Sequence, residues 1–421
     1  MMDRRTFVKT AAATAVASTT AAWGTLARAQ GEPIRIGLLA PLTGVVAAGG
    51  KEMVEGFSMY WDSVGKKSAG RAIEVIVEDD ASNPDTALQK ARRLVEQRNV
   101  HMLAGDLLAN TGLAVAEYVR GTGTPYFIPI IAADDLTQRK RIPNVVRIAG
   151  YSASQMPRPL ADWAAKKKGL KRIITVSQDY TFGHEQCGGF AQVFSNAGGT
   201  IAQQFWHPLN TADFSPYLAQ IASLSPDGVF AMETGADATR FIQQWNNFGL
   251  KGKIQLLGAQ NFTDQSVIRT LGAECEGIFS SAHFCEGNDA PATRKFVADY
   301  EKQFGKLPSL YGFSMYSGAL WLDAAFKAVN GKVEDRPTFL KAVNAVQLKD
   351  SPLGRPVRLD EYGNPIYDVF IRETKRRSGG KFWNVPVEAY PGVSQFWTYK
   401  PEDYMKQPPY SRTFQGINAK I

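Results

Sequence analysis

The sequence predicts an α/β protein with two lobes, each built around a doubly wound parallel sheet. Short runs of β-branched and other apolar residues alternate with segments of helical periodicity, and the same alternation starts again near Gly150. The chain has 421 residues, 44% of them apolar, which is typical of a globular protein of two or three domains. It contains no fixed-period repeat.

In the first half, apolar strand runs are expected at 34–39, 73–77, 100–104 and 126–131. Helical spacing lies between them at 52–64 and 113–120, and Asn83-Pro84-Asp85 is a helix start signal for a third helix. Strands separated by helices of this length form βαβ units. We therefore expect a parallel sheet with helices on both faces.

The second half repeats this plan. Strands are expected at 173–177, 200–206, 229–232 and 254–257, and helices at 154–168, 183–197, 217–224 and 238–248. Two longer helices are predicted at 290–304 and 309–329. Beyond Val346 the chain is rich in strand formers, proline and aromatic residues, and Lys375-Arg376-Arg377 is expected in a solvated hairpin turn.

The N-terminus resembles a twin-arginine export signal. Arg4 and Arg5 precede a hydrophobic pair and a lysine, and a mildly apolar stretch follows to Leu26. Small residues at Ala27 and Ala29 place the cleavage site after Ala29, so residues 1–29 are predicted to be a signal peptide. The alternative is a membrane anchor, but threonine and serine interrupt the apolar run. No later segment has 18 consecutive apolar residues, so we expect a periplasmic location.

The charge does not favour nucleic-acid binding. The formal net charge is +8, and it falls to +5 without the first 30 residues. This surplus is small for a chain of this length. Of the three cysteines, Cys187 is expected to be a free buried thiol. Cys275 and Cys285 flank an apolar stretch, and a strand there would hold them apart, so a disulfide needs the chain to fold back. Both states stay open.

Catalytic and metal-binding constellations are missing from the sequence. The four histidines have no metal-ligand spacing, and there is no G-x-S-x-G elbow and no phosphate-binding G-x-x-x-x-G-K-[ST] loop. Asp79 and Asp80 fit turn acids better than an acid/base couple, and His184 fits a structural or solvated histidine. We therefore expect no enzyme activity, no metal and no cofactor.

Four segments carry a resemblance that spans most of the chain: 34–44 (IRIGLLAPLTG), 78–84 (EDDASNP), 100–110 and 178–183. Together they resemble the periplasmic binding proteins of branched-chain amino-acid ABC importers. The resemblance implies a type I periplasmic-binding fold, in which three chain crossings join two lobes that close on a small ligand. On that model, lobe one comprises 30–150 plus 284–345, and lobe two comprises 151–283 plus 346–421. The implied partners are a small carboxylate and an inner-membrane ABC permease, and the implied state is a monomer. A sensor of the same fold is the alternative.

The expected binding site lies between the lobes. Ligands of open α/β sheets bind beyond the carboxyl ends of the strands, where helix N-termini expose unpaired N–H groups. After the predicted strand 100–104, Asn110 and Thr111 offer side-chain donors for a carboxylate. A plain N-cap for the next helix is the alternative role of these two residues.

The sequence departs from amino-acid binders of this family in ways that favour another ligand. Where such proteins have a hydroxyl, this chain has Ile130, Ile131 and Ala132, and where they place an acidic residue for the ligand ammonium it has Gln260. A buried ammonium without a carboxylate is costly. Phe182 and Tyr311 offer aromatic walls, with hinge or core packing as the alternative. An aromatic or aliphatic carboxylate is therefore expected, at the candidate ligand-binding residues Asn110, Thr111, Ile130, Ile131, Ala132, Phe182, Thr234, Gln260 and Tyr311.

Overall fold

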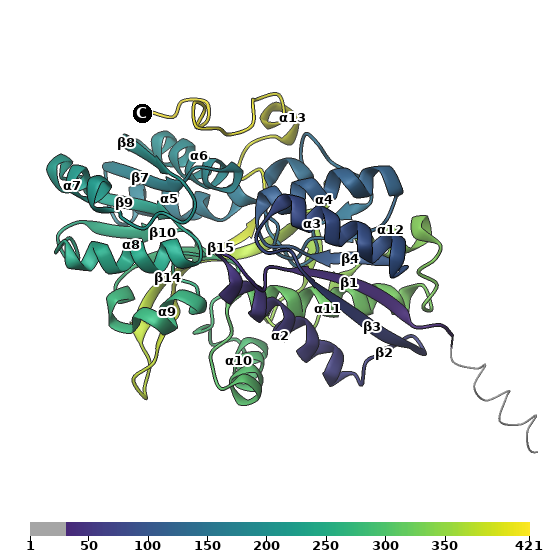
Figure 1. Ribbon diagram of the computed structural model, residues 1–421. Coiled ribbons are helices and arrows are strands. Elements are labelled where there is room, and N and C mark those ends of the chain that lie inside the picture. The colour runs from purple at the N-terminus through teal and green to yellow at the C-terminus, as the bar shows by residue number, and fades with distance from the viewer. Residues whose placement is uncertain (1–30) are drawn as a thin grey trace, which may run out of the picture.

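The computed structural model describes residues 31–421, so the predicted signal peptide lies outside the described residues. The chain forms two α/β lobes side by side, one coloured teal and the other mainly purple and blue in Figure 1. We define each lobe by its sheet. Among the described residues, no helix is long and apolar enough to cross a membrane.

The first lobe is built around a six-stranded sheet in the order β2-β3-β1-β4-β5-β6. The central strand β1 runs parallel to both neighbours, β3 and β4. Strands and helices of this part are β1 (Ile34–Ala40), α2 (Ala47–Ser63), β2 (Lys67–Ser68), β3 (Arg71–Asp79), α3 (Pro84–Arg92), β4 (Met102–Gly105), α4 (Ala109–Thr122), β5 (Tyr126–Phe127) and β6 (Val145–Val146).

The second lobe contains a nine-stranded sheet with a parallel core. Its path runs β12-β13-β14-β11-β10-β9-β7-β8, and β15 pairs with β14. The elements from the first half of this part are α5 (Pro157–Lys166), β7 (Arg172–Gln178), α6 (Thr181–Asn196), β8 (Thr200–His207), α7 (Ser215–Leu224), β9 (Gly228–Met232), α8 (Ala236–Asn247), β10 (Gln255–Gly258), α9 (Gln265–Leu271) and β11 (Phe279–Ala282).

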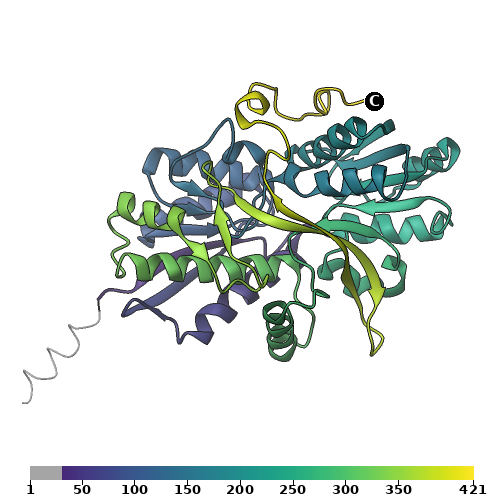
Figure 2. The same ribbon diagram turned by 180° about the vertical axis from the view of Figure 1, so that it is seen from behind.

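Three helices and four strands lie between β11 and the C-terminal segment. They are α10 (Pro291–Phe304), α11 (Leu310–Ala328), α12 (Arg336–Ala345), β12 (Gln347–Leu348), β13 (Val357–Leu359), β14 (Pro365–Arg376) and β15 (Phe382–Val393). The chain passes between the lobes after β6, after β11 and again after α12, because β12 and β13 already belong to the second sheet. The long antiparallel pair β14–β15 crosses the back of the molecule behind both lobes (Figure 2).

The first lobe is held together by α11, which packs along α2. The two helices approach so closely that a Cβ atom on Gly56 would lie 2.0 Å from the carbonyl oxygen of Gly312. Only glycine fits at this crossing. This contact fixes α11, which enters the fold late in the chain, onto the lobe formed by the first 150 residues.

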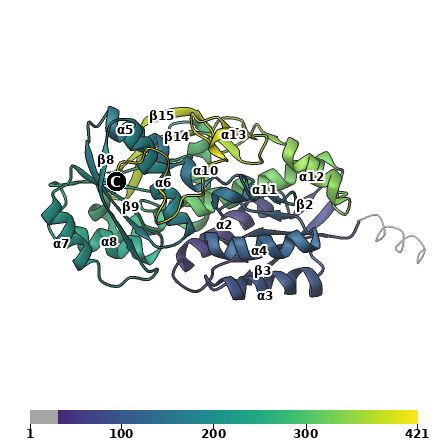
Figure 3. The ribbon, with the colours of Figure 1, turned by 90° about the horizontal axis from the view of Figure 1, so that it is seen from above.

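The C-terminal segment covers α6. It contains α13 (Pro401–Tyr404) and runs across the top of the molecule, where it is drawn in yellow (Figures 1 and 3). The buried guanidinium of Arg158 donates to the hydroxyls of Tyr404 and Tyr410 at 2.8 and 3.3 Å. Arg139, from the first lobe, donates to the carbonyls of Gln407 and Tyr404. The segment therefore contacts both lobes.

Most predicted elements are confirmed, with three instructive differences. The predicted strand 126–131 ends at Phe127, because Pro129 has no N–H to donate to a ladder. The helix predicted at 113–120 begins four residues earlier, at Ala109. The helix predicted at 154–168 starts as a 3₁₀ turn at 153–155 and becomes α-helical only at Pro157. Short α9 and α12 escaped the sequence analysis.

The open question about the cysteines is answered by the structure. All three cysteines are buried and free, so Cys275 and Cys285 form no disulfide and Cys187 is a free thiol as expected. Lys375 and Arg376 end β14, and Arg377 donates its backbone N–H to the carbonyl of Lys381 in the hairpin turn. The predicted hairpin is therefore present, but Lys375 and Arg376 belong to its first strand and only Arg377 lies in the turn.

Candidate functional site

A small cavity lies between the lobes, at the carboxyl ends of the parallel strands. It receives residues from the segments that follow β4, β5, β7, β9 and β10, and from the crossing after β6. Its free volume is about 10 Å³, which is room for about one water molecule, so the lobes are closed on each other. The lining residues are Leu107, Ala109, Ile130, Ala132, Tyr151, Tyr180, Phe182, Thr234 and Asn261.

The first lobe presents the N-terminus of α4 to this cavity. The N-cap residue Leu108 provides no side-chain cap, and the first turn of α4 contains no acidic residue. The backbone N–H groups of Ala109 and Asn110 donate to no other group of residues 31–421. Unpaired N–H groups and the positive end of the helix dipole favour an anion at this position.

The predicted side-chain donors on α4 do not line the cavity. Thr111 is fully buried, and its hydroxyl donates to the carbonyl of Leu108 at 2.7 Å. The side-chain oxygen of Asn110 accepts from the backbone N–H of Thr111 at 3.1 Å. Because α4 starts before these residues, both side chains serve the first turn of the helix. The backbone N–H groups at the start of α4 are therefore the free donors that this helix presents beside the cavity.

Of the other predicted site residues, Ile130, Ala132, Phe182 and Thr234 line the cavity, whereas Ile131, Gln260 and Tyr311 lie outside it. Ile131 packs on Gly112 of α4. The side chain of Gln260 turns to Gln186, with an Nε2–Oε1 distance of 3.4 Å.

Tyr311 stands behind the cavity and joins the two lobes. Its hydroxyl accepts a hydrogen bond from the side-chain amide of Asn261 at 2.9 Å. Tyr311 belongs to α11, which packs on the first lobe, and Asn261 follows β10 of the second. The residue therefore supports the closed form rather than the cavity wall.

The sequence analysis missed Leu107, Ala109, Tyr151, Tyr180 and Asn261 as cavity residues. Tyr180 precedes α6 and lies 6.1 Å from Phe182 between ring centroids. Tyr151 lies in the first crossing, directly after the point where the strand and helix rhythm restarts. An aromatic residue at a crossing is a usable signal, because a crossing passes beside the cleft.

Aromatic and aliphatic side chains line the cavity together with Thr234 and Asn261, and no charged side chain lines it. Burial raises the pKa of Tyr151 to about 12, and it also raises the pKa of Tyr180. Both phenols therefore stay neutral and keep their O–H donors at physiological pH. The arrangement offers hydrogen-bond donors and flat walls to a small anion, and no carboxylate to an ammonium group.

Asp79 and Asp80 have separate roles. The carboxylate of Asp79 accepts from the backbone N–H groups of Leu42 and Ala81, at 2.9 and 2.8 Å, which makes it a turn acid as predicted. Asp80 is buried instead against Asp106, which also accepts from the hydroxyl of Tyr126 at 2.8 Å. Burial and the charge of Asp106 raise the pKa of Asp80 to about 9, and burial raises the pKa of Asp106 too, so the pair holds a proton at neutral pH.

We expect Asp80→Asn to flatten the pH dependence of folding. Between the ordinary pKa of an aspartate and the folded value of about 9, the folded protein holds a proton that the unfolded chain has released. The contribution of Asp80 to the free energy of unfolding therefore falls as pH rises through this range. An asparagine amide donates to Asp106 at any pH, because it does not titrate. The free energy of unfolding of the variant, relative to that of the wild type, should therefore be higher at pH 8.5 than at pH 5.

Urea denaturation of both proteins at pH 5, 7 and 8.5 measures this difference. Asp79→Asn is the control. Hydrogen bonds lower the pKa of Asp79, so its contribution to stability is complete above its ordinary pKa and is lost only in acid. Its substitution should leave the slope between pH 5 and 8.5 unchanged. Parallel curves for Asp80→Asn and wild type would contradict the shared proton.

Two histidine sites carry no catalytic arrangement. His184 lies outside the cavity, and its Nε2 is 2.8 Å from the carboxylate of Asp179. His207, Glu233 and Asp237 form a buried group whose ligand atoms lie within 4.8 Å. His207 bonds Glu233 at 2.9 Å, and Arg240 pairs with Asp237. The second carboxylate oxygen of Glu233, Oε2, has no hydrogen-bond partner within residues 31–421.

Two α/β lobes joined by chain crossings, with a small aromatic cavity between their strand ends, define the class of two-lobed solute-binding proteins. Residues 33–381 match the family model described as Periplasmic binding protein. The chain therefore belongs to the periplasmic binding protein family, whose members serve ABC transporters, bind small molecules and act with membrane permeases.

Relatives agree with this assignment. The chain is 28% identical over 370 residues to Leu/Ile/Val-binding protein homolog 6 of Brucella melitensis biotype 1, covering 86% of this chain and 93% of the relative. An ABC transporter solute-binding protein from R. palustris, solved in complex with benzoate, is 30% identical with a TM-score of 0.80, covering 86% and 97% of the two chains. Another, from Rhodopseudomonas palustris BisB5 with 3,4-dihydroxy benzoic acid, is 26% identical with a TM-score of 0.81, covering 86% and 98%.

Proposed function

We propose that this protein captures a small aromatic carboxylate in the periplasm and delivers it to an inner-membrane ABC permease. The observation that carries the proposal is the lining of the cavity between the lobes: aromatic rings, free backbone N–H groups at the start of α4 and no charged side chain. Capture requires no catalytic group. Two similar proteins that were solved with benzoate and 3,4-dihydroxy benzoic acid support the same ligand class.

The carboxylate is placed at the N-terminus of α4 and the ring between Tyr180, Phe182 and the apolar loop at Ile130 and Ala132. Backbone N–H groups and a helix N-terminus stabilise an anion. Aromatic walls add offset or edge contacts to a planar ligand. Thr234, whose hydroxyl donates to Gln178 at 2.8 Å, closes the wall on the side of the second lobe.

Closure of the lobes is part of the proposal. The cavity of about 10 Å³ is smaller than an aromatic acid, so the lobes must separate for entry and close around the ligand with adjusted side chains. A ligand that binds mainly the closed form shifts the population toward it. Export by the N-terminal twin-arginine signal and action as a monomer complete the proposed cycle.

We expect calorimetry to show benzoate or a hydroxybenzoate binding at least tenfold tighter than leucine, isoleucine or valine. Tenfold corresponds to about 1.4 kcal/mol. The physical reason is the ammonium group of an amino acid, which finds no carboxylate among the cavity-lining residues. Small-angle scattering with and without the acid tests closure, and mass spectrometry of ligand extracted from gently purified protein identifies the natural compound.

Tight leucine binding without any response to aromatic acids would overturn the ligand class but leave the binding-protein assignment. Superimposable scattering profiles of the free and the bound protein would overturn closure. Phe182→Ala removes an aromatic wall and should weaken binding of the acid. Phe248→Ala, at an exposed phenylalanine outside the cavity, is the matched control.

A further inference from the structure

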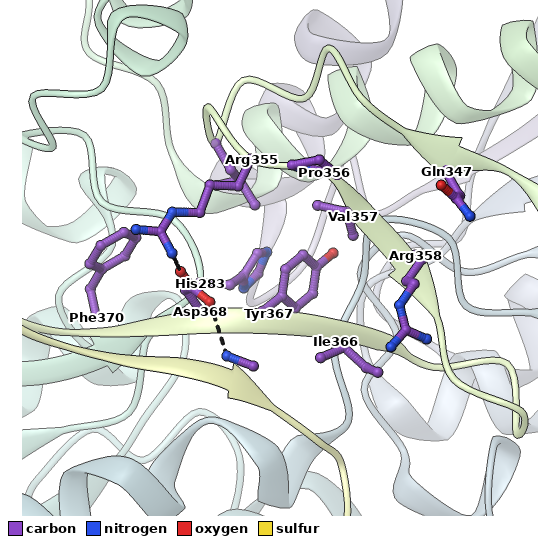
Figure 4. A pocket seen from close by; sticks show the side chains of 12 residues that line it. His283, Gln347, Arg355, Pro356, Val357, Arg358, Ile366, Tyr367, Asp368 and Phe370 are labelled. Atoms are coloured by element: carbon purple, nitrogen blue, oxygen red, sulfur yellow. Dashed lines mark hydrogen bonds and ion pairs between the residues drawn. The ribbon is translucent and has the colours of Figure 1, made fainter.

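A second cavity, of about 310 Å³, lies outside the cleft and is lined mainly by residues of β13, β14 and the segment before β13. It has the volume of a small-molecule site. None of its lining residues lines the cavity between the lobes. Figure 4 shows the lining side chains around His283 and Tyr367, with Arg355 and Asp368 at one end and Arg358 and Gln347 at the other.

The cavity exists because β14 changes its partner strand. Its first residues pair with β13, at Pro365 and Ile366, and it pairs with β11 only from Phe370 onward. Between these positions no strand of the described chain lies on this edge of β14. Residues 367–369 therefore border an open stretch of sheet edge, where a ligand has room to lie.

His283 is the unusual group of this site. The residue is fully buried, and neither ring nitrogen has a hydrogen-bond partner within the described residues. Burial and the nearby charge of Arg372 lower its pKa to about 3, so the imidazole is neutral and offers one donor and one acceptor. A buried polar group without a partner destabilises a fold. A buried histidine that destabilises the fold in this way is typical of a functional site, where binding and not stability explains the residue.

The ends of the cavity differ in charge. At one end, Arg355 pairs with Asp368, which also accepts from the backbone N–H of Gly392 at 2.9 Å. At the other end, Arg358 takes part in no ion pair with any residue of 31–421. The walls between them are apolar, from Leu353, Val357, Ile366 and Phe370. An acid therefore finds its free cation only at the Arg358 end.

We propose that this cavity is a second binding site, for a small planar organic acid that also carries a hydroxyl group. The carboxylate pairs with Arg358, and the apolar body lies along β14. The ring nitrogens of His283 are covered in this structure, so on binding the ring turns toward the cavity and one nitrogen meets the hydroxyl. The site lies on the strand that crosses behind both lobes (Figure 2).

The geometry also couples this site to the cleft. The ring of His283 stacks on Tyr367 with centroids 4.4 Å apart, and its centroid lies 5.4 Å from that of the tilted Tyr151 ring. Tyr151 lines the cavity between the lobes. Tyr367, His283 and Tyr151 thus form a continuous row from one site to the other, so a ligand that fixes His283 changes the wall of the cleft.

Calorimetry with 4-hydroxybenzoate tests the site in a protein whose cleft is blocked by Ala132→Trp. We expect this variant to keep one binding event, which adding Leu353→Trp weakens at least tenfold by filling the second cavity. Arg358→Gln should weaken the same event, whereas Arg355→Gln is the matched control because Arg355 is committed to Asp368. Leu353→Trp alone leaves the cavity between the lobes intact. Calorimetry of this single variant therefore tests the proposed function independently of the second site.

His283→Phe gives an independent measurement. It removes two unpaired nitrogens from an aromatic environment, so it should raise the melting temperature while it abolishes binding in the Ala132→Trp background. The second site would be overturned if the Ala132→Trp protein showed no binding. It would also be overturned if neither Leu353→Trp nor Arg358→Gln changed the affinity, or if His283→Phe lowered the melting temperature.

Discussion

Arg147→Met is expected to lower the free energy of unfolding by about 3–5 kcal/mol, because it leaves several buried hydrogen-bond acceptors without their donor. Arg147 is fully buried, and its guanidinium donates to the carbonyls of Ile131 and Ala133 and to the side-chain oxygen of Asn364. Burial lowers its pKa to about 10, which leaves it charged at neutral pH. Methionine fills much of the space but leaves these buried acceptors unpaired.

The same substitution should weaken ligand binding. The carbonyls held by Arg147 belong to the loop that carries Ile130 and Ala132 into the cleft cavity. Without the guanidinium this loop loses its support, because Pro129 prevents it from continuing β5. The arginine therefore takes the place of strand pairing in this part of the cleft wall.

Urea denaturation and calorimetry measure the two effects, with Arg141→Met as the matched control. Arg141 is exposed and makes a single hydrogen bond, to the carbonyl of Glu361. Its replacement should change stability far less. Equal effects of the two substitutions would show that the buried network does not hold the loop.

The fold was predictable because its signals are local and repeated. Strands such as 34–39 and 173–177 are short apolar runs, and their alternation with helices fixes a parallel sheet with helices on both faces. The crossings are different. β14 belongs to the second sheet although α11 and α12, which precede it, pack with the first lobe, and no local pattern encodes that exchange.

Residues of the candidate site were predictable only where they directly follow the end of a predicted strand. Ile130, Ala132, Phe182 and Thr234 follow strand ends, and the structure brings them together. Thr111 and Asn110 are not among the lining residues because α4 begins before them, and helix boundaries depend on capping that the sequence does not show here. The proton shared by Asp80 and Asp106 depends on burial across two strands, which sequence spacing does not reveal.

Arg269→Met is expected to weaken binding of the ligand at least tenfold without touching the cavity. Arg269, on α9 of the second lobe, pairs with Glu52, on α2 of the first, and donates to the carbonyl of Leu307 at 2.8 Å. The side chain of Glu52 is only 3% exposed, and burial raises its pKa.

The reason lies in the balance between open and closed forms. In the closed form, methionine leaves Glu52 buried with Lys306, at 3.6 Å, as its remaining ion-pair partner. In an open form water reaches the carboxylate, so the substitution penalises closure alone. Any extra free energy needed to close the lobes makes the observed binding free energy less favourable by the same amount. An extra cost of about 1.4 kcal/mol weakens the affinity tenfold.

Calorimetry gives the affinity, and scattering of the ligand-bound protein at subsaturating ligand should show a larger open fraction. Lys295→Met is the control, because its partner Asp299 lies on the same helix, α10, and both side chains are exposed. An unchanged affinity for Arg269→Met would mean that the pair between α2 and α9 survives opening. In that case α2 and α9 would move together during opening, and the two rigid parts of the molecule would not coincide with the two sheets.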